Sequence, residues 1–159
     1  MDTQQPPVSL ALTEMGIPHR VFRHDGPIRS LEQAAAERGQ QPDQIIRSIL
    51  FRLSAEEFVL VLMAGPRQID WKALRRYLGQ KRLTMADEAE MLRMTGYPRG
   101  AVSPFGLPQP LRTLADESIF THDEVSIGSG VRGTTIIMAQ TDLQRALGEV
   151  ERVRLGKGG

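Results

Sequence analysis

The chemistry of this sequence is concentrated in one run of small and turn-forming residues, 95–106, which reads TGYPRGAVSPFG. Its glycines allow backbone conformations closed to other residues, and its prolines fix φ and lack an N–H donor. The run therefore predicts a shaped loop. Such loops often hold a ligand, although a plain connector fits the same residues. Ser103 is the candidate nucleophile here, but hydrogen bonding within the turn is the interpretation we favour.

A second glycine-rich run, 128–133, reads GSGVRG and fits the dinucleotide-binding pattern G-x-G-x-x-G. That pattern binds phosphate only when a strand precedes it and a helix follows, because the phosphate then meets the helix N-terminus. Here the β-branched run 134–138 follows, which predicts a strand. We therefore interpret the run as a glycine turn between two strands and rank a nucleotide-binding oxidoreductase last among the possible functions.

The histidines do not suggest a metal site. His19, His24 and His122 lack the spacing of metal ligands, and the sequence contains no cysteine. We expect neither a metal nor another cofactor. A Ser/His/Asp hydrolase is not indicated either, since no G-x-S-x-G motif is present. His24 and Asp25 are predicted to form a polar pair at the surface, with a place near a pocket mouth as the alternative.

The 95–106 loop also carries a family resemblance. From Gly96 to Gly106 the chain reads G-Y-x-x-G-x-x-S-P-x-G, which resembles a loop of the YbaK/prolyl-tRNA-synthetase-associated domain family. The similarity extends from Leu10 to Leu147. Members of that family are aminoacyl-tRNA deacylases, which hydrolyse wrongly charged tRNA. The resemblance implies a mixed, partly barrel-like β-sheet surrounded by helices, the 3′ end of aminoacyl-tRNA as partner, and an aminoacyl-tRNA synthetase as a further partner.

Arg47 is where the chain departs from this family. The segment IIRSIL, 45–50, aligns with V-V-K-T-L, which places Arg47 at the family's lysine. Lysine can lose its proton and act as a base, whereas arginine cannot. Arginine can still orient an ester or a phosphate with its planar fork, which is how the family mechanism is read. We therefore expect activity, with Arg47 facing the cleft; a surface arginine is the plain alternative.

The resemblance implies hydrolysis of the ester by a positioned water, helped by the terminal ribose hydroxyl of the tRNA, without a covalent nucleophile. Backbone N–H groups of Gly100–Pro104 are the expected donors to the oxyanion, and pocket size is expected to select a small amino acid. The expected catalytic positions are Arg47, Gly100, Ser103 and Pro104. The expected substrate-binding positions are Ile49, Gly65, Ala101, Val102, Phe105, Asp116, Gly130 and Gly133.

Two alternatives to this prediction remain open, one for the role of Asp116 and one for the activity of the chain. Asp116 lies in a D-E-S segment similar to the family's, but a helix cap explains it at least as well. With Arg47 in place of lysine, the chain could also be a catalytically weakened module that binds tRNA ends, a synthetase or a small molecule.

Composition is that of an ordinary globular chain. Its 159 residues fit a single domain spanning 1–159, with 40% hydrophobic and 25% charged residues. The net charge of +1 gives no bulk electrostatic argument for nucleic-acid binding, and all of the 20 basic residues except Lys72, Lys81 and Lys157 are arginine. Without a long apolar run or a basic N-terminal flank, we expect no membrane span and a cytoplasmic location. Residues 1–7 and 155–159 are expected to be flexible.

Periodicity predicts interleaved helices and strands. The expected helices are 8–15, 30–38 with a cap at Ser30, a turn at 42–46, 70–79 with a cap at Asp70, one from Thr84 or Ala86, and one capped by Thr141 and Asp142 that reaches Val150. The expected strands are 18–23, 48–53, 58–63, 111–114, 125–127 and 134–138. Because the elements do not follow a strict βαβ alternation, we predict an α/β (α+β) fold, a mixed sheet with helices packed around it.

Overall fold

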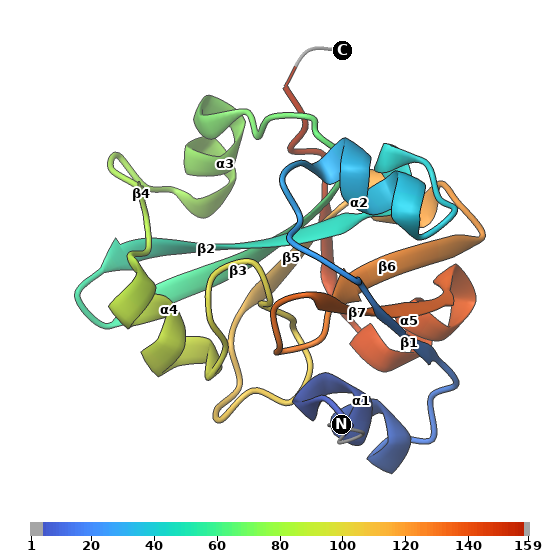
Figure 1. Cartoon of the computed structure of the whole chain (residues 1–159). Helices are drawn as coiled ribbons and strands as arrows, with labels where there is room; N and C mark the ends of the chain where they lie inside the picture. Colours follow the sequence, from blue (N-terminus) through green and yellow to red (C-terminus); the bar gives the residue numbers. More distant parts are fainter. Residues whose placement is uncertain (1–4, 158–159) are drawn as a thin grey trace.

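The computed structural model describes residues 5–157, whose strands form two β-sheets with helices around them (Figure 1). This confirms the predicted fold class. The elements, in chain order, are α1 (Pro7–Glu14), β1 (Arg20–Arg23), α2 (Leu31–Glu37), η1 (Pro42–Gln44), β2 (Ile46–Ser54), β3 (Glu57–Ala64), α3 (Trp71–Leu78), β4 (Thr84–Met85), α4 (Glu88–Thr95), β5 (Thr113–Asp116), η2 (Glu117–Phe120), β6 (Glu124–Gly128), β7 (Thr134–Ala139), α5 (Gln140–Leu147) and β8 (Glu151–Val153).

The two sheets differ in size and direction. The larger has the order β4-β2-β3-β5-β8; β4, β2 and β3 pair antiparallel, whereas β3, β5 and β8 pair parallel. The smaller, β1-β7-β6, is antiparallel. They meet where Ile45, just before β2, forms a parallel bridge to Ser126 of β6. The sheets do not close further, so the barrel-like character is limited to this junction.

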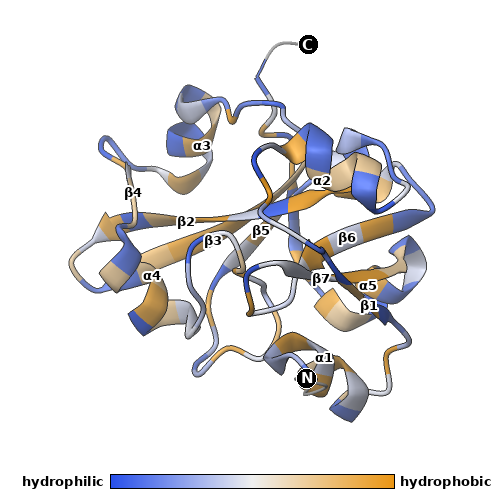
Figure 2. Ribbon diagram, in the orientation of Figure 1, coloured by the Kyte–Doolittle hydropathy of each residue, from blue (hydrophilic) through white to orange (hydrophobic). Residues whose placement is uncertain are grey.

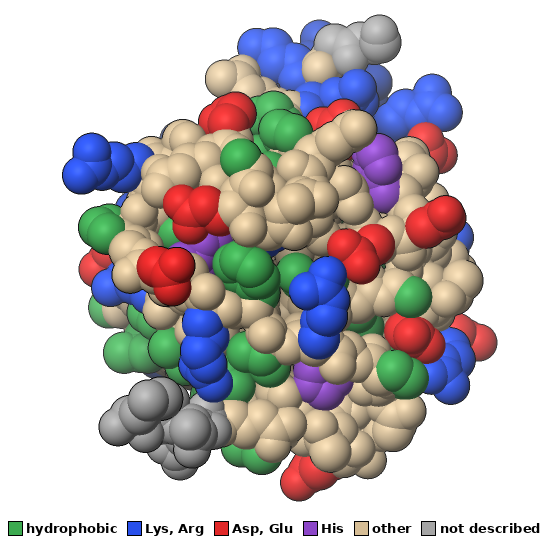
Figure 3. Space-filling view, turned by 45° about the vertical axis from the view of Figure 1, so that its right-hand side comes forward, with side chains coloured by type: hydrophobic (Ala, Val, Ile, Leu, Met, Phe, Trp, Pro, Cys, Tyr) green, Lys and Arg blue, Asp and Glu red, His purple; other side chains and the backbone are tan. Residues whose placement is uncertain are grey.

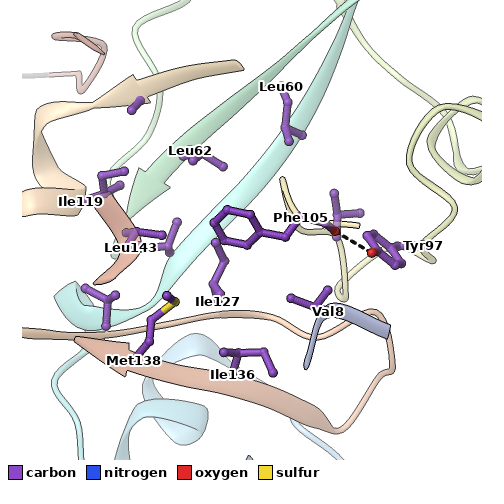
Figure 4. Close-up of a cluster of buried hydrophobic side chains, with 14 of the residues drawn as sticks. Val8, Leu60, Leu62, Tyr97, Phe105, Ile119, Ile127, Ile136, Met138 and Leu143 are labelled. Atoms are coloured by element: carbon purple, nitrogen blue, oxygen red, sulfur yellow. Dashed lines mark hydrogen bonds between the residues drawn. The ribbon is translucent and has the colours of Figure 1, made fainter. Parts of the chain in front are cut away.

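Strand β3 is apolar along nearly its whole length because both of its faces are buried. Successive side chains of a strand point to opposite faces. Leu62 accordingly joins a cluster between the two sheets, while Val61 joins a cluster on the outer face of the larger sheet. In the first cluster, Ile127 and Ile136 of the smaller sheet lie on the side opposite Leu62 (Figure 4). One core therefore holds the two sheets together.

Helix α3 covers the outer face of the larger sheet. Leu74 is fully buried there, and the ring of Trp71 meets the ring of Phe51 edge to face, with 5.1 Å between centroids. The long strands β2 and β3 beneath are among the most hydrophobic segments of the chain (Figure 2). The expected core position of Trp71 is therefore confirmed, although the residue is only partly buried.

Local capping signals set several helix ends as predicted. The Ser30 hydroxyl accepts a hydrogen bond from the Gln33 N–H at 3.0 Å, and the Asp70 carboxylate accepts one from the Ala73 N–H at 3.0 Å. These bonds satisfy backbone donors that a helix N-terminus leaves free. Helix α3 ends at Gly79, whose φ of 68° is a left-handed conformation that glycine adopts without strain.

Two predicted helix starts are wrong. Helix α4 begins after Asp87, not at Thr84 or Ala86, because 84–85 pair with β2 as strand β4. Helix α5 has no side-chain cap: Thr141 and Asp142 lie within its first turn, after the N-cap Ala139. In both cases pairing or packing with distant residues determines where the helix starts.

The end of the chain is more ordered than expected. Strand β8 was not predicted; the last helix was expected to reach Val150 but ends before Gly148. Leu155 is fully buried, and its N–H donates to the Asp116 carboxylate at 2.6 Å. Pro6 is also buried. The expected flexibility of 1–7 and 155–159 thus does not hold for these two residues, while 1–4 and 158–159 lie outside the described residues.

Candidate functional site

A cavity of about 190 Å³ lies where the two sheets meet, beside the 95–106 loop. We call it the junction pocket. Its walls come from α2, the start of β2, the loop, and the strands β6 and β7, so segments distant in sequence converge there. The lining residues are Ile28, Arg38, Ile45, Ile46, Arg47, Ser48, Gly100, Val102, Ser126, Ile127, Gly128, Gly133, Thr134 and Thr135.

The loop is held in shape by a buried tyrosine. The Tyr97 hydroxyl donates to the carbonyl of Phe105 at 2.6 Å, the bond drawn in Figure 4, and to that of Gly106 at 3.1 Å. Burial raises the pKa of Tyr97, which keeps the hydroxyl protonated and able to donate. A Cβ on Gly130 would lie 2.9 Å from the tyrosine ring, so the turn between β6 and β7 can pack here only with glycine.

Backbone donors face no acceptor on the loop side of the junction pocket. The N–H groups of Gly100 and Val102 make no hydrogen bond with any of the residues 5–157. The neighbouring Ala101 N–H, by contrast, donates to Pro98 at 3.0 Å. Backbone N–H groups without a partner beside a cavity are suited to bind a ligand oxygen. Val102 is buried, where an unpaired donor costs free energy, whereas Gly100 is exposed.

Ser103 takes the structural role that we favoured from the sequence. It is fully buried, and its hydroxyl accepts a hydrogen bond from the Phe105 N–H at 3.2 Å. Ser103 does not line the junction pocket. No histidine bonds its hydroxyl within residues 5–157, so this serine lacks the base that a nucleophile needs.

Arg47 reaches the pocket but its guanidinium is engaged on another side. Its Nε donates to the Gly65 carbonyl at 2.7 Å and one Nη donates to the Arg67 carbonyl, both in the connection from β3 to α3. Burial lowers the pKa of Arg47. These two donors therefore bond the backbone outside the pocket, while Arg47 still lines the pocket, and its expected catalytic role stays a prediction.

Arg38 supplies a second guanidinium to the junction pocket. It follows the last turn of α2; its Nη1 donates to the Ser126 hydroxyl at 2.9 Å and its Nε donates to His24 Nε2 at 3.0 Å. Burial lowers the pKa of Arg38 to about 10, which leaves it a cation at neutral pH. Sequence reasoning missed this residue, because nothing local connects the end of α2 with β6.

Ser48 adds a polar atom with no partner. Its hydroxyl oxygen is buried in the pocket wall and makes no hydrogen bond within the described part of the chain. Side chains 48 and 47 point to opposite faces of β2, since strand side chains alternate. Both residues contribute to the lining of the cavity, from opposite faces of the strand, and the sequence alone does not fix this register.

His24 also differs from the expectation. Its side chain is fully buried and is bonded through Nδ1 to Glu37 at 2.6 Å and through Nε2 to Arg38, rather than paired with Asp25 at the surface. The hydrogen bond with His24, followed by that from Gln33, lowers the pKa of Glu37. The histidine therefore belongs to a hydrogen-bonded network that runs from the exposed Glu37 to Arg38 at the pocket.

Four predicted site residues line the junction pocket: Arg47, Gly100, Val102 and Gly133. Ala101 lies behind the lining, fully buried, and Gly130 packs beneath Tyr97. Ile49 packs on the outer-face cluster.

The remaining predicted residues lie away from this pocket. Phe105 is in the core between the sheets, and with Pro104 it borders a separate cavity of about 580 Å³. Gly65 packs against Asp43, and Asp116 lines another cavity of about 480 Å³. The Asp116 carboxylate accepts the Ser118 N–H at 2.9 Å and caps η2, which is the capping role that the sequence allowed. Substrate binding by these residues stays a prediction without support from the pocket lining.

An outer cavity of about 640 Å³ adjoins the junction pocket and shares Ile28, Gly100 and Gly133 with it. Arg99 and Arg132 stand at its wall, where the Arg132 Nε donates to the Arg99 carbonyl at 2.9 Å. On the face that Figure 3 shows, basic and acidic side chains are interspersed, in keeping with the net charge of +1. The wall of the outer cavity therefore carries the two arginines together with one carboxylate, that of Asp25.

Other kinds of site find little support. Within residues 5–157 no cluster of three or more His, Cys, Asp or Glu side chains is arranged to hold a metal ion. The 128–133 run is a turn between β6 and β7, as expected, and not the start of a helix. None of the described helices combines the length and apolar character needed to cross a membrane.

The comparisons with known proteins include a family model and relatives that are described as editing proteins. Over residues 25–146 the chain matches the model of the aminoacyl-tRNA editing domain. It is 26% identical over 138 residues to the multifunctional Ser/Thr-tRNA deacylase ProXp-y of Escherichia coli K12, covering 84% of this chain and 82% of that protein. A solved structure of a candidate trans-editing enzyme for prolyl tRNA synthetase superposes with a TM-score of 0.86 at 26% identity, over 96% of both chains.

The match to a synthetase covers a smaller share of both proteins. The chain is 28% identical over 97 residues to the proline–tRNA ligase of Aquifex aeolicus, which is 61% of this chain but 17% of the ligase. The resemblance is thus to one section of that enzyme. Since the family model spans most of the described residues and the relatives agree with it, the chain belongs to the aminoacyl-tRNA editing domain family.

Proposed function

We propose that this chain hydrolyses the ester that joins a small, wrongly attached amino acid to the 3′ end of a tRNA, and that it does so in the junction pocket. The observation that carries the proposal is the coincidence of the family match with a pocket whose loop offers the free N–H groups of Gly100 and Val102. The relative ProXp-y, named as a deacylase of Ser- and Thr-tRNA, is similar over most of both lengths.

The reaction needs no covalent intermediate. The oxygen of a water bonds to the ester carbonyl carbon, the bond from that carbon to the ribose oxygen breaks, and a water proton passes to the ribose oxygen. Negative charge develops on the carbonyl oxygen, where the N–H groups of Gly100 and Val102 donate. Removing one such donor in other enzymes costs about 10²–10³ in rate.

The pocket fits a small polar side chain. Its volume of about 190 Å³ limits the size of the amino acid, and the unpartnered Ser48 hydroxyl favours one that carries a hydroxyl of its own. A site built to pair with a polar group discriminates against a substrate that lacks it, because its own group is then left unsatisfied. We therefore propose serine or threonine as the amino acid removed.

The outer cavity is the proposed place for the last nucleotides of the tRNA. It opens from the junction pocket, and Arg99 and Arg132 at its wall suit phosphate oxygens. The similarity to part of a proline–tRNA ligase makes a synthetase a proposed second partner. Salt should then weaken tRNA binding, since ionic contacts to phosphate release counterions.

Single-turnover hydrolysis of a panel of charged tRNAs, with enzyme in excess, tests the function. We expect release of serine or threonine well above the rate in buffer. Ile28→Trp should slow release, because Ile28 lies at the shared rim of both cavities and is exposed. The matched control is Leu10→Trp, an exposed apolar residue on α1 that lines neither cavity. Tight tRNA binding with no release from any substrate would instead establish a non-catalytic binding module.

Selectivity has its own test. Ser48→Ala should lower the preference for seryl-tRNA over alanyl-tRNA by about tenfold, the size of one lost hydrogen bond, without changing the rate on alanyl-tRNA. The ratio of the two single-turnover rates measures this. An unchanged ratio would show that Ser48 does not read the side chain.

A further inference from the structure

The junction pocket holds a half-buried cation, Arg38, that forms no direct ion pair with a carboxylate of the described residues. Arg38 takes part in none of the ion pairs formed within residues 5–157. Its two bonds go to neutral acceptors, the Ser126 hydroxyl and the His24 ring. Glu37 acts on this charge only through space and through His24, without a direct bond, and charged groups in a cavity wall are concentrated at functional sites. Arg38 therefore marks a place where the pocket receives electron-rich oxygen from a ligand.

The network behind Arg38 fixes its orientation. Because the Arg38 Nε–H points at His24 Nε2, that ring nitrogen must carry the lone pair, and the ring proton is on Nδ1. The Nδ1–H then donates to the Glu37 carboxylate at 2.6 Å. The Phe22 ring meets the histidine edge to face at 5.0 Å between centroids. The second Nη of Arg38 has no acceptor among residues 5–157, so this network leaves it free for a ligand.

Each of the two arginines keeps one Nη without a hydrogen bond among residues 5–157, but they differ in where their other bonds hold the guanidinium. Arg47 donates hydrogen bonds from Nε and one Nη to carbonyls of the β3–α3 connection, outside the junction pocket. Arg38 makes one of its two bonds to Ser126 in the pocket wall itself, which holds the guanidinium at the cavity. Of the two, Arg38 is the better placed to meet a substrate.

We propose that Arg38, rather than Arg47, is the cation that contacts the scissile ester, donating from its free Nη to the carbonyl oxygen, and that His24 is a positioning residue that aims it. This inference rests on the proposed hydrolase function. Arg38 adds a full positive charge to the two backbone donors, opposite the oxyanion that forms as water attacks. It takes no proton from the water, since a guanidinium stays charged.

The first experiment compares Arg38→Met and Arg38→Lys with Arg47→Met in single-turnover hydrolysis of seryl-tRNA. We expect Arg38→Met to lose about 10²-fold or more in rate, Arg38→Lys to lose less, and Arg47→Met to lose less than tenfold. Arg52→Met is the matched control, because Arg52 is an exposed arginine of β2 that pairs with Glu90 away from the pocket. Circular dichroism and thermal unfolding of each variant establish that it folds.

A binding measurement separates contact in the transition state from loss of structure. The probe is seryl-adenosine with an amide in place of the ester, which the enzyme cannot hydrolyse. The Arg38→Met variant should bind this probe within about tenfold of wild type while its rate falls much further, because the carbonyl gains most of its negative charge only during reaction. Equal losses in binding and rate would overturn the assignment to the oxyanion.

The role of His24 is tested by rescue. His24→Gln keeps an acceptor for the Arg38 Nε, whereas His24→Phe keeps ring bulk without one. We expect His24→Gln to retain most of the rate, His24→Phe to approach Arg38→Met, and the double variant of Arg38→Met and His24→Phe to be no slower than Arg38→Met alone. Additive losses in the double variant would show that His24 acts independently of Arg38.

The failures can be told apart. Wild-type protein that releases no amino acid overturns the proposed function and this inference with it. Active wild type whose rate survives Arg38→Met but collapses in Arg47→Met overturns this inference alone. If Arg38→Met does not fold, the comparison of Arg38→Lys with Arg47→Lys in the same two assays decides between the two arginines.

Discussion

Gly128 is the position at which a single added methyl group would do most to disturb the pocket. A Cβ there would overlap the Val102 carbonyl oxygen and lie 2.9 Å from backbone atoms of Ala101. Gly128→Ala must therefore push the 95–106 loop away from β6, and we expect a loss of about 1–3 kcal/mol in unfolding free energy. Urea denaturation measures it. Gly26→Ala is the control, with open space around its Cβ, and should change stability by less than about 0.5 kcal/mol.

For individual residues, the sequence identified the loop but did not predict which atoms the arginine side chains would bond. Gly100 and Val102 line the pocket as expected, since turn chemistry is local. The roles of Arg47 and Arg38 were not predictable in this way. They depend on which carbonyls lie near the end of β3 and which hydroxyl of β6 faces α2, and these contacts join residues far apart in the sequence.

Among the elements, those with local signals were predicted and those defined by pairing were not. The β2–β3 hairpin and helix α3 carry clear periodicity and, for α3, a cap at Asp70 and a stop at Gly79. Strands β4 and β8 are too short to show a period, and each exists because a neighbouring strand offers free backbone groups. A strand of two or three residues therefore cannot be predicted from the hydrophobic pattern alone.

The short strand β8 gives a prediction about acid. The Glu151 carboxylate accepts two hydrogen bonds from Arg112, at 2.8 and 2.9 Å, and one from the Tyr77 hydroxyl at 2.8 Å. These partners, with the Arg112 bonds first, lower the pKa of Glu151 to about 2. A carboxylate with a lowered folded pKa stabilises the fold above its ordinary value of 4.5, and this contribution is lost as the pH falls from 4.5 towards 2.

Glu151→Gln should therefore lower stability at pH 7 and leave a smaller decline between pH 4.5 and 2 than in wild type. The effect is modest because the pair is partly exposed to solvent. Thermal unfolding across this pH range measures both quantities. Parallel curves for the two proteins would contradict the role of this cluster.

For the whole molecule, composition and the interleaving of helices and strands were enough to predict the fold class. They did not predict that the strands divide into two sheets. Both sheets contribute to one cluster, in which Leu62 and Ile136 belong to different sheets. The apolar runs predicted strands. Which strand pairs with which is decided by burial on both faces of β3 and by the single bridge from Ile45 to Ser126, and neither is visible in a pattern.

This shared core predicts that the chain unfolds as one unit. Ile136→Ala, in the smaller sheet, should cost about 2–5 kcal/mol by leaving a cavity. Trp71, the only tryptophan, lies over the larger sheet and reports on that part. We expect its fluorescence and the far-ultraviolet circular dichroism of Ile136→Ala to change at the same, lowered urea concentration. Two separate midpoints would indicate that the sheets unfold independently.

The parallel pairing of β5 between β3 and β8 has a consequence for the order in which the protein can assemble during synthesis. The β2–β3 hairpin leaves the ribosome early, but the other edge of β3 must wait for β5, and the edge of β5 must wait for β8. Until then an apolar strand is exposed with unpaired backbone groups, which is the kind of surface that aggregates or recruits chaperones. We expect nascent chains that stop short of β8 to need such protection, although they already contain every residue of the junction pocket.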